Sequence, residues 1–364
     1  MSLKTAPRKY LWVWFLWLGL FYAAWLLLMQ IDGNWQAAKE HWPMALAMAL
    51  GSYAAGSTPM GGGTVGFPVL VLLFDMPATL GRDFSFAVQS IGMVSAAIFI
   101  LCRRQPLAWS MLKGSVVGAL IGTPIGILFF APLIPELWIK VTFAVLWGSF
   151  GVLHLYRIGE ISGHIGMTEF DEHWDHRVGF ILGLAASVLA VSVTGVGIDM
   201  VLYAALVLLC RADLKIAIPT SVVIMGLTSF YGVIIKSVTH SWQPGVYENW
   251  LAAAPIVALG APLGVFIVER IGRKPILLVV AALCVGQFIW TCFAEQEALG
   301  LLGIALAMGA LLLCLWVFEL LRLWGNRLVS AAQQKHAAKM QAGAPGSVRS
   351  NNAHGPASNP LGSD

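Results

Sequence analysis

Two glycine-rich segments interrupt long apolar runs, and they carry the polar groups best suited to bind a ligand. The first segment contains, in order, Ser57, Thr58, Gly61, Gly62, Gly63 and Thr64. The second contains Thr194, Gly195 and Gly197, and Asp199 follows it by two residues. No other apolar run in the chain combines glycines and hydroxyl side chains so densely, so these two segments are the first candidates for a functional site.

An interrupted helix inside a membrane leaves backbone N–H and C=O groups unpaired, which is tolerated only against protein or a wet cavity. N–H groups at the start of a half-helix suit an anion, since they lie at the positive end of the helix dipole. Glycine lets such a ligand approach the backbone, and serine and threonine add donors. We therefore predict an anion site where the two segments meet. The alternative is that the glycines only permit tight helix packing.

Asp199 is the charged residue that we place deepest in the membrane. A carboxylate at that depth is costly and is by default a functional hypothesis, so we expect it to take up and release a proton. It could equally cap the helix that begins after Gly197. Gln89 and Ser90, in the helix after the first segment, could bond a substrate's oxygens or simply bond a neighbouring helix.

The chain shows no catalytic constellation and no phosphate-binding loop. The five cysteines lie in or beside apolar runs without paired spacing, and the His- and acid-containing loop at 159–177 is explained by solvation alone. We therefore expect no enzyme activity, no metal site and no cofactor.

The elements that carry these residues follow from composition. Of 364 residues, 58% are hydrophobic and 11% are charged, whereas a soluble domain carries about 25% charged residues. This excludes a soluble enzyme, a nucleic-acid-binding protein and a disordered protein. The apolar runs do not alternate with polar residues, which excludes a membrane β-barrel. The fold class is therefore an all-α polytopic membrane protein, with about 8–10 transmembrane helices expected.

The two halves of the chain resemble each other. Gly61 and Ser85 recur as Gly197 and Ser221 at one offset, and a Gly-x-Pro-x-Gly pattern at 122–126 recurs at 260–264. We expect an N-terminal extra helix at 1–30, a first repeat at 41–157, a cytoplasmic polar linker at 158–177, a second repeat at 178–293, a last helix at 297–323 and a disordered cytoplasmic tail at 325–364.

Lysine and arginine placement predicts the topology. If each glycine-broken hairpin returns to its own side, the cationic residues gather on one side and leave only Lys39, Arg82, Lys140 and Lys236 on the other. By the positive-inside rule both termini are then cytoplasmic, and the repeats have opposite orientations. Inverted repeats with broken helices are typical of secondary transporters. Arg82 would be a loop charge that either sets topology or attracts an anion.

The segment Met60-Gly61-Gly62-Gly63-Thr64-Val65-Gly66-Phe67-Pro68-Val69-Leu70 resembles the glycine-rich signature of the sulfite exporter TauE/SafE family, also called the 4-toluene sulfonate uptake permease family. Pro219-Thr220-Ser221 resembles the Thr-Ser pair that opens a helix in that family, which adds Ser221 to the candidate site. The resemblance spans about residues 42–293. It implies transport of sulfite, organosulfonates or other small sulfur-containing anions.

The expected function is therefore a secondary transporter of small sulfur-containing anions, coupled to protons, in the cytoplasmic (inner) membrane of a bacterium. An anion channel and a carrier of other small carboxylates or oxyanions are the alternatives. The expected partners are a small anion and the lipid bilayer, without nucleic acid, and a homodimer is one candidate assembly.

The topology can be tested with reporter fusions. Fusions at Lys39 and at Gly325 should report opposite sides of the membrane, because the charge distribution places an odd number of crossings between them. Reporters on the same side would contradict the inverted arrangement.

Overall fold

A computed structural model describes residues 10–168 and 170–342 of the chain. These residues form helices joined by short connections, and the described part contains no strand. Within it, nine helical segments are long and apolar enough to cross a membrane, which confirms the predicted class. They are Leu11–Leu28, Ala78–Cys102, Trp109–Leu133, Glu136–Ile161, Glu172–Thr194, Leu214–Val238, Val246–Val268, Arg273–Ala294 and Gln296–Ala331.

The first half starts with a broken hairpin. Helix α3 (Trp42–Ser57) ends at the first glycine segment, and the chain resumes as α4 (Gly63–Pro68) and a π-helical turn (Val69–Leu73). Three long helices follow: α5 (Ala78–Cys102), α6 (Trp109–Ile125), which continues as a second π-helical turn, and α7 (Glu136–Ile161). Pro68 and Pro124 lie at or just before the two π-helical turns. Proline has no backbone N–H and cannot make the usual helical hydrogen bond, so the hydrogen-bond pattern of the helix changes near each of these residues.

The second half has the same order of elements. Helix α8 (Glu172–Ala186) continues through a π-helical turn into the short α9 (Ser192–Thr194), and the chain breaks before α10 (Ile198–Leu208). Helices α11 (Leu214–Val238), α12 (Val246–Ile271) and α13 (Arg273–Ala294) then match α5, α6 and α7 in order.

The first arm of each half packs on the other half. Helix α3 lies along α12, and α8 lies along α6, while α5 contacts α11 and α7 contacts α13. Because α3 and α12 of one contact correspond to α8 and α6 of the other, these two contacts are equivalent. The α5–α11 and α7–α13 contacts each join a helix to its own counterpart in the other half. The two halves therefore interlock through their broken hairpins and do not sit side by side as separate bodies.

Glycines line both interlocking seams. On α6, a Cβ at Gly114, Gly118 or Gly122 would meet the backbone carbonyl of His176, Phe180 or Leu184 on α8. On the other seam, a Cβ at Gly56 of α3 would meet the carbonyl of Ala261 on α12. Small residues at four-residue spacing are how membrane helices bring their backbones together. The Gly-x-Pro-x-Gly patterns at 122–126 and 260–264 lie at these seams.

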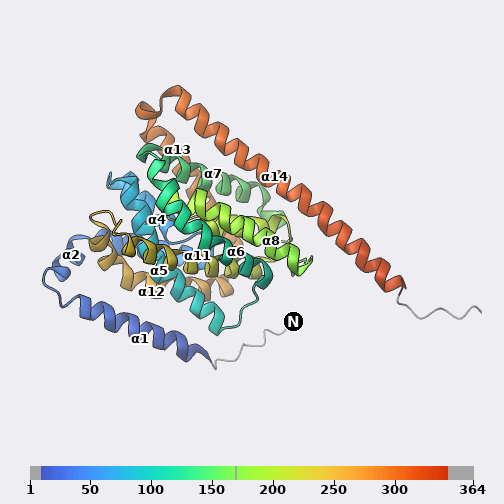
Figure 1. The fold of residues 1–364 in the computed structure, drawn as a ribbon, viewed down its shortest axis with the longest axis horizontal. Coiled ribbons are helices and arrows are strands. Elements are labelled where there is room, and N and C mark those ends of the chain that lie inside the picture. The colour runs from blue at the N-terminus through green and yellow to red at the C-terminus, as the bar shows by residue number, and fades with distance from the viewer. Residues whose placement is uncertain (1–9, 169, 343–364) are drawn as a thin grey trace, which may run out of the picture.

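The terminal helices flank this body. Helix α1 (Leu11–Leu28) lies along one side, and α14 (Gln296–Ala342) runs along another and projects beyond the rest of the molecule (Figure 1). Most α1 side chains are exposed, and only Leu18 is buried, as suits a helix surrounded by lipid. A short helix, α2 (Asn34–Glu40), connects α1 to α3.

The predicted boundaries need two corrections. Helix α14 continues to Ala342, so residues 325–342 are helical and the prediction of disorder from 325 is wrong for them; residues 343–364 lie outside the described residues. The polar linker is shorter than the predicted 158–177, because α7 ends at Ile161 and α8 begins at Glu172. In both places polar residues extend an apolar helix, and composition alone places the helix end too early.

The glycine seam can be tested by adding one methyl group. Gly118→Ala should lower the free energy of unfolding by about 1–3 kcal/mol, because its Cβ meets a backbone carbonyl that cannot move aside. The matched control is Gly286→Ala on α13, where a Cβ would meet nothing within 4 Å. Melting temperatures in detergent measure both. Equal melting temperatures for the two variants would contradict the proposed role of the seam.

Candidate functional site

The two glycine breaks meet inside the protein, and α5 runs past both. Gln89 on α5 donates from Nε2 to the carbonyl of Gly195 at 3.1 Å, and its Oε1 lies against Gly61. One turn earlier, the Ser85 side chain lies 2.6 Å from the position a Cβ would take on Gly63 and 2.8 Å from that of Gly195. We refer to Gly61, Gly63, Ser85, Gln89, Gly195, Gly197 and Asp199 as the crossing.

The second break needs glycine for its backbone. Gly195 and Gly197 have φ of +79° and +117°, a region that side chains with a Cβ rarely adopt. The Thr194 hydroxyl bonds the chain across the break, accepting from the Val196 N–H at 3.3 Å and donating to the carbonyl of Val196 at 3.0 Å or of Ala190 at 2.9 Å. These bonds hold a tight loop between α9 and α10.

Asp199 caps helix α10. Its Oδ1 accepts the N–H of Gly197 at 3.2 Å and of Met200 at 3.0 Å, so the predicted cap is present. The side chain is fully buried, and its Oδ2 has no hydrogen bond of normal geometry, although the Gly61 backbone N–H interacts with the carboxylate. The Gly61 backbone faces this carboxylate, with Oδ2 3.4 Å from the position of a Cβ on Gly61. Capping therefore uses half of the carboxylate and leaves the other half facing the first break.

The hydroxyls near the first break are mostly occupied by their own helix. Ser57 donates to the carbonyl of Tyr53 at 2.9 Å, and Thr58 donates to that of Ala54 at 2.7 Å. Each hydroxyl has one proton, so neither has a donor left for an anion in this state. Thr64 is different, because its buried Oγ1 has no partner.

Three other predicted residues contact helix α3 or their own helix. A Cβ on Gly62 would contact Met48 and Ala55 of α3. The Ser221 hydroxyl donates to the carbonyl of Ile218 on its own helix at 2.8 Å. Ser90 is bonded in the same way to Ala87 at 2.8 Å and lines a lateral groove of about 800 Å³ between α1, α5, α11 and α12. Ser85 was missed as a site residue, although its recurrence as Ser221 was a signal.

A buried ion cluster lies at the start of α5. Asp83 Oδ1 pairs with Arg82 Nε and with Lys236 Nζ, both at 2.9 Å, and its Oδ2 accepts the N–H of Gln243 at 3.1 Å. The three charged side chains are buried. Arg82 is thus not a loop charge, contrary to expectation. Two cations share one carboxylate, so the cluster retains an excess positive charge in the protein interior.

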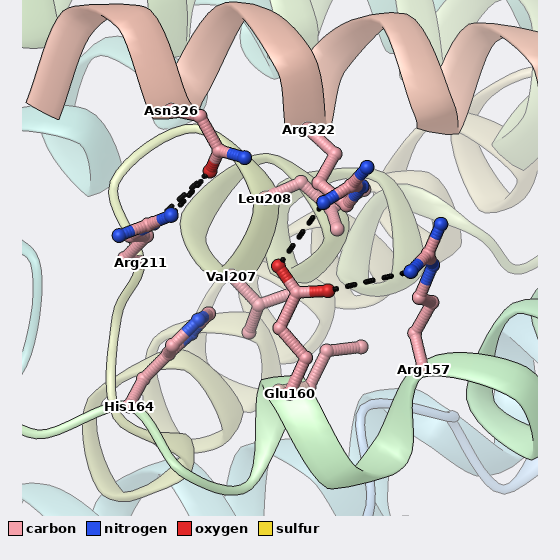
Figure 2. Close-up of a pocket in the computed structure, with 9 residues that line it drawn as sticks. Arg157, Glu160, His164, Val207, Leu208, Arg211, Arg322 and Asn326 are labelled. Carbon is pink, nitrogen blue, oxygen red and sulfur yellow. Dashed lines mark hydrogen bonds and ion pairs between the residues drawn. The ribbon is translucent and has the colours of Figure 1, made fainter. Parts of the chain in front are cut away.

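A second ionic group ties α14 to the body at a different place. Figure 2 shows Glu160 of α7 between Arg157 and Arg322, at 3.7 and 3.4 Å, and Arg211 bonded to Asn326. The enclosed cavity of about 10 Å³ has room for about one water molecule. Burial, and then the charge of Arg211, lower the pKa of His164 beside it. This group joins α14 to α7 and to the loop between α10 and α11, and it lies outside the crossing.

The described residues contain no group of three His, Cys, Asp or Glu side chains that could hold a metal ion. Besides the crossing, α7 and α10 share one buried polar pair. His154 Nε2 lies 3.0 Å from the hydroxyl of Tyr203, one turn along α10 from Asp199.

The structure separates two neighbouring glycines that the sequence does not distinguish. Gly61→Ala should displace Gln89, because the new Cβ falls on Oε1, and should lower both anion affinity and melting temperature. Gly62→Ala should have little effect on either, since its nearest neighbour is the flexible end of Met48 at 3.1 Å. Binding and melting measured on both purified variants test this. A stronger loss of affinity in Gly62→Ala would move the site away from the crossing.

Comparison with known proteins places these features in a family. The family model described as Sulfite exporter TauE/SafE matches residues 44–291, which include both breaks and helices α4–α12 in full. Neither the curated proteins nor the solved structures yield a match. Because the matched region is more than half of the chain and contains the whole crossing, the chain belongs to the sulfite exporter TauE/SafE family of transport proteins.

Proposed function

We propose that this protein is a secondary transporter of small sulfur-containing anions, sulfite or an organosulfonate, and that proton transfer at Asp199 drives it. The crossing is the observation that supports this proposal most directly. There, two broken helices from different halves of a transporter-family chain meet around the buried carboxylate of Asp199. Broken helices that meet at the interface of two repeats are where secondary transporters bind substrate and coupling ion.

The capping bonds of Asp199 suggest how an anion and a proton are linked. In this state the carboxylate Oδ1 already occupies the N–H groups at the start of α10. A sulfite or sulfonate oxygen has the same acceptor chemistry and would compete for them. Protonation of Asp199 weakens its own hold on these groups and removes a negative charge that would repel the substrate. The residues proposed to receive the anion first are Gly61, Gly63, Thr64, Gln89, Thr194, Gly195 and Gly197. The other residues predicted from the sequence, Ser57, Thr58, Gly62, Ser90 and Ser221, are proposed to take part only after their present contacts change.

The Thr64 hydroxyl is free to donate a hydrogen bond to an anion in this state. Its oxygen has no hydrogen-bond partner, whereas Ser57 and Thr58 are bonded to their own helix. The excess positive charge of the Arg82–Asp83–Lys236 cluster lies seven residues before Gln89 on the same helix, about 10 Å along its axis. A charge at that distance within the protein favours an approaching anion.

The cytoplasmic membrane, with both termini in the cytoplasm, is the proposed location.

The coupling role predicts a specific phenotype. In proteoliposomes, Asp199→Asn should abolish anion uptake driven by a pH gradient while leaving anion binding detectable, because asparagine keeps the shape but carries no exchangeable acidic proton. The matched control is Asp213→Asn, which alters a carboxylate that caps α11 through the Lys215 N–H at 2.8 Å but lies at the helix end, outside the crossing.

The substrate and the coupling have separate outcomes. An uptake panel of sulfite, taurine, sulfoacetate, thiosulfate, sulfate, aromatic sulfonates and simple carboxylates identifies the anion, and uptake of carboxylates alone would contradict the sulfur-anion assignment. If the Asp199→Asn variant shows full uptake driven by a pH gradient, Asp199 has no role in proton coupling and acts only as a helix cap. Currents far above the turnover of a carrier would favour an anion channel.

A further inference from the structure

Two buried acceptor oxygens share the space beside Gly61. They are Oε1 of Gln89 and Oδ2 of Asp199, and neither has a hydrogen-bond partner. Gln89 is 1% exposed and Asp199 is 0% exposed. Both oxygens lie within 3.4 Å of the position that a Cβ would take on Gly61. The first belongs to the first half of the chain and the second to the other half, so the space beside Gly61 lies at the interface between the halves.

The direction of each oxygen is determined by the bonds of its partner atom. Gln89 Nε2 donates to the carbonyls of Ser85 and Gly195, both at 3.1 Å. A flipped amide would place its oxygen against these two carbonyls, so Oε1 must point to the crossing. Asp199 Oδ1 is held by the N–H groups of Gly197 and Met200, which leaves Oδ2 on the side of Gly61. Neither side chain can turn its free oxygen away without breaking two hydrogen bonds.

Within the described part of the chain, neither oxygen of this pair accepts a hydrogen bond of normal geometry; besides its cap donors, Asp199 interacts with the Gly61 backbone N–H. The titratable groups on the surrounding elements are engaged elsewhere: His154 of α7 with Tyr203 of α10, and Cys284 of α13 with Met60 at 3.7 Å. On α5 and α11, Arg82 and Lys236 pair with Asp83. A buried acceptor without a donor destabilises the protein, and two such acceptors beside the same glycine also repel each other. One hydrogen placed between them satisfies both.

We propose that a proton on Asp199 Oδ2 is donated in a hydrogen bond to Gln89 Oε1, and that this bond ties the two halves together at the crossing. The proposal rests on the proposed function and deepens it, because it names the group that holds the coupling proton. Loss of the proton to water leaves two acceptors facing each other, which favours separation of the breaks. Gln89 is then a positioning residue: it makes the protonation of Asp199 a contact between the halves.

Infrared spectroscopy of the purified protein without substrate tests this directly. We expect a carboxylic-acid C=O band that is lost in Asp199→Asn. The band should move to higher frequency in Gln89→Met, since the acid loses its acceptor, and should stay in place in the control Gln287→Met on α13. If Gln89→Met does not fold, Gln89→Asn draws the oxygen back by one methylene and should move the band in the same direction.

Thermal unfolding gives a second readout. The amide of Asp199→Asn can donate to Gln89 Oε1 at every pH, so this variant should melt at least as high as the parent protein. The double variant Asp199→Asn/Gln89→Met should melt a few degrees lower than Asp199→Asn. In the parent protein, Gln89→Met should lower the melting temperature more at acidic than at alkaline pH. The opposite order would contradict the proposal, because at alkaline pH the carboxylate has no proton to share.

Three further results would overturn the proposal. One is the absence of an acid band at every pH at which the protein is folded, and another is a band that Gln89→Met and Gln89→Asn leave unmoved. The third is a melting temperature raised by sodium in the parent but not in Gln89→Met, which would make the two oxygens sodium ligands. Since these measurements contain no substrate, a failure of sulfite transport with the band shift intact would reject the proposed function alone.

Discussion

A membrane interior provides no water for backbone groups that leave a helix, and the crossing meets this constraint with side chains. The chain is interrupted twice, and each interruption would expose N–H and C=O groups at a cost of several kcal/mol. The Gln89 amide supplies a donor for Gly195, and the Asp199 carboxylate supplies an acceptor for Gly197. Thr194 closes the loop between them. The second break therefore takes most of its hydrogen bonds from its own residues and one from α5.

This arrangement requires α5 to approach both breaks closely, and Gly61, Gly63 and Gly195 leave room for Gln89 and Ser85 of α5. The glycine seams then hold each broken hairpin in place. Helix α3 packs closely on α12, and α8 packs closely on α6. In both seams, backbone carbonyls of one helix occupy the space that a side chain on the facing glycine would need. Each broken hairpin is thereby fixed to the opposite half. A relative movement of the halves must change the contacts at the crossing, which is why a polar pair located there can link a chemical event to a conformational one.

The polar character of the crossing differs from a simple anion site. Its buried unpartnered oxygens on Gln89 and Asp199 are acceptors, and the hydroxyls of Ser57 and Thr58 have donated their protons to their own helix. The positive charges lie instead on Arg82 and Lys236, which both pair with the carboxylate of Asp83. In the state described here the crossing is thus better suited to a proton than to an oxyanion, and the proposed anion site depends on a change in the bonds of Asp199.

The sequence by itself determined the membrane class, the positions of both breaks, the repeat and the family. Each of these depends on composition or on local order along the chain: few charges, glycine runs, and Gly-x-Pro-x-Gly patterns that mark the seams. It did not determine which polar side chains meet. Helices that are apolar on all sides carry no periodic signal of which face is inward, so Ser85 was missed as a contact of both breaks. Arg82 was assigned to a loop because a charge beside an apolar run normally marks its end. Only the packing of α5 between the two breaks brings Gln89 opposite Asp199, since that depends on contacts between residues more than a hundred positions apart.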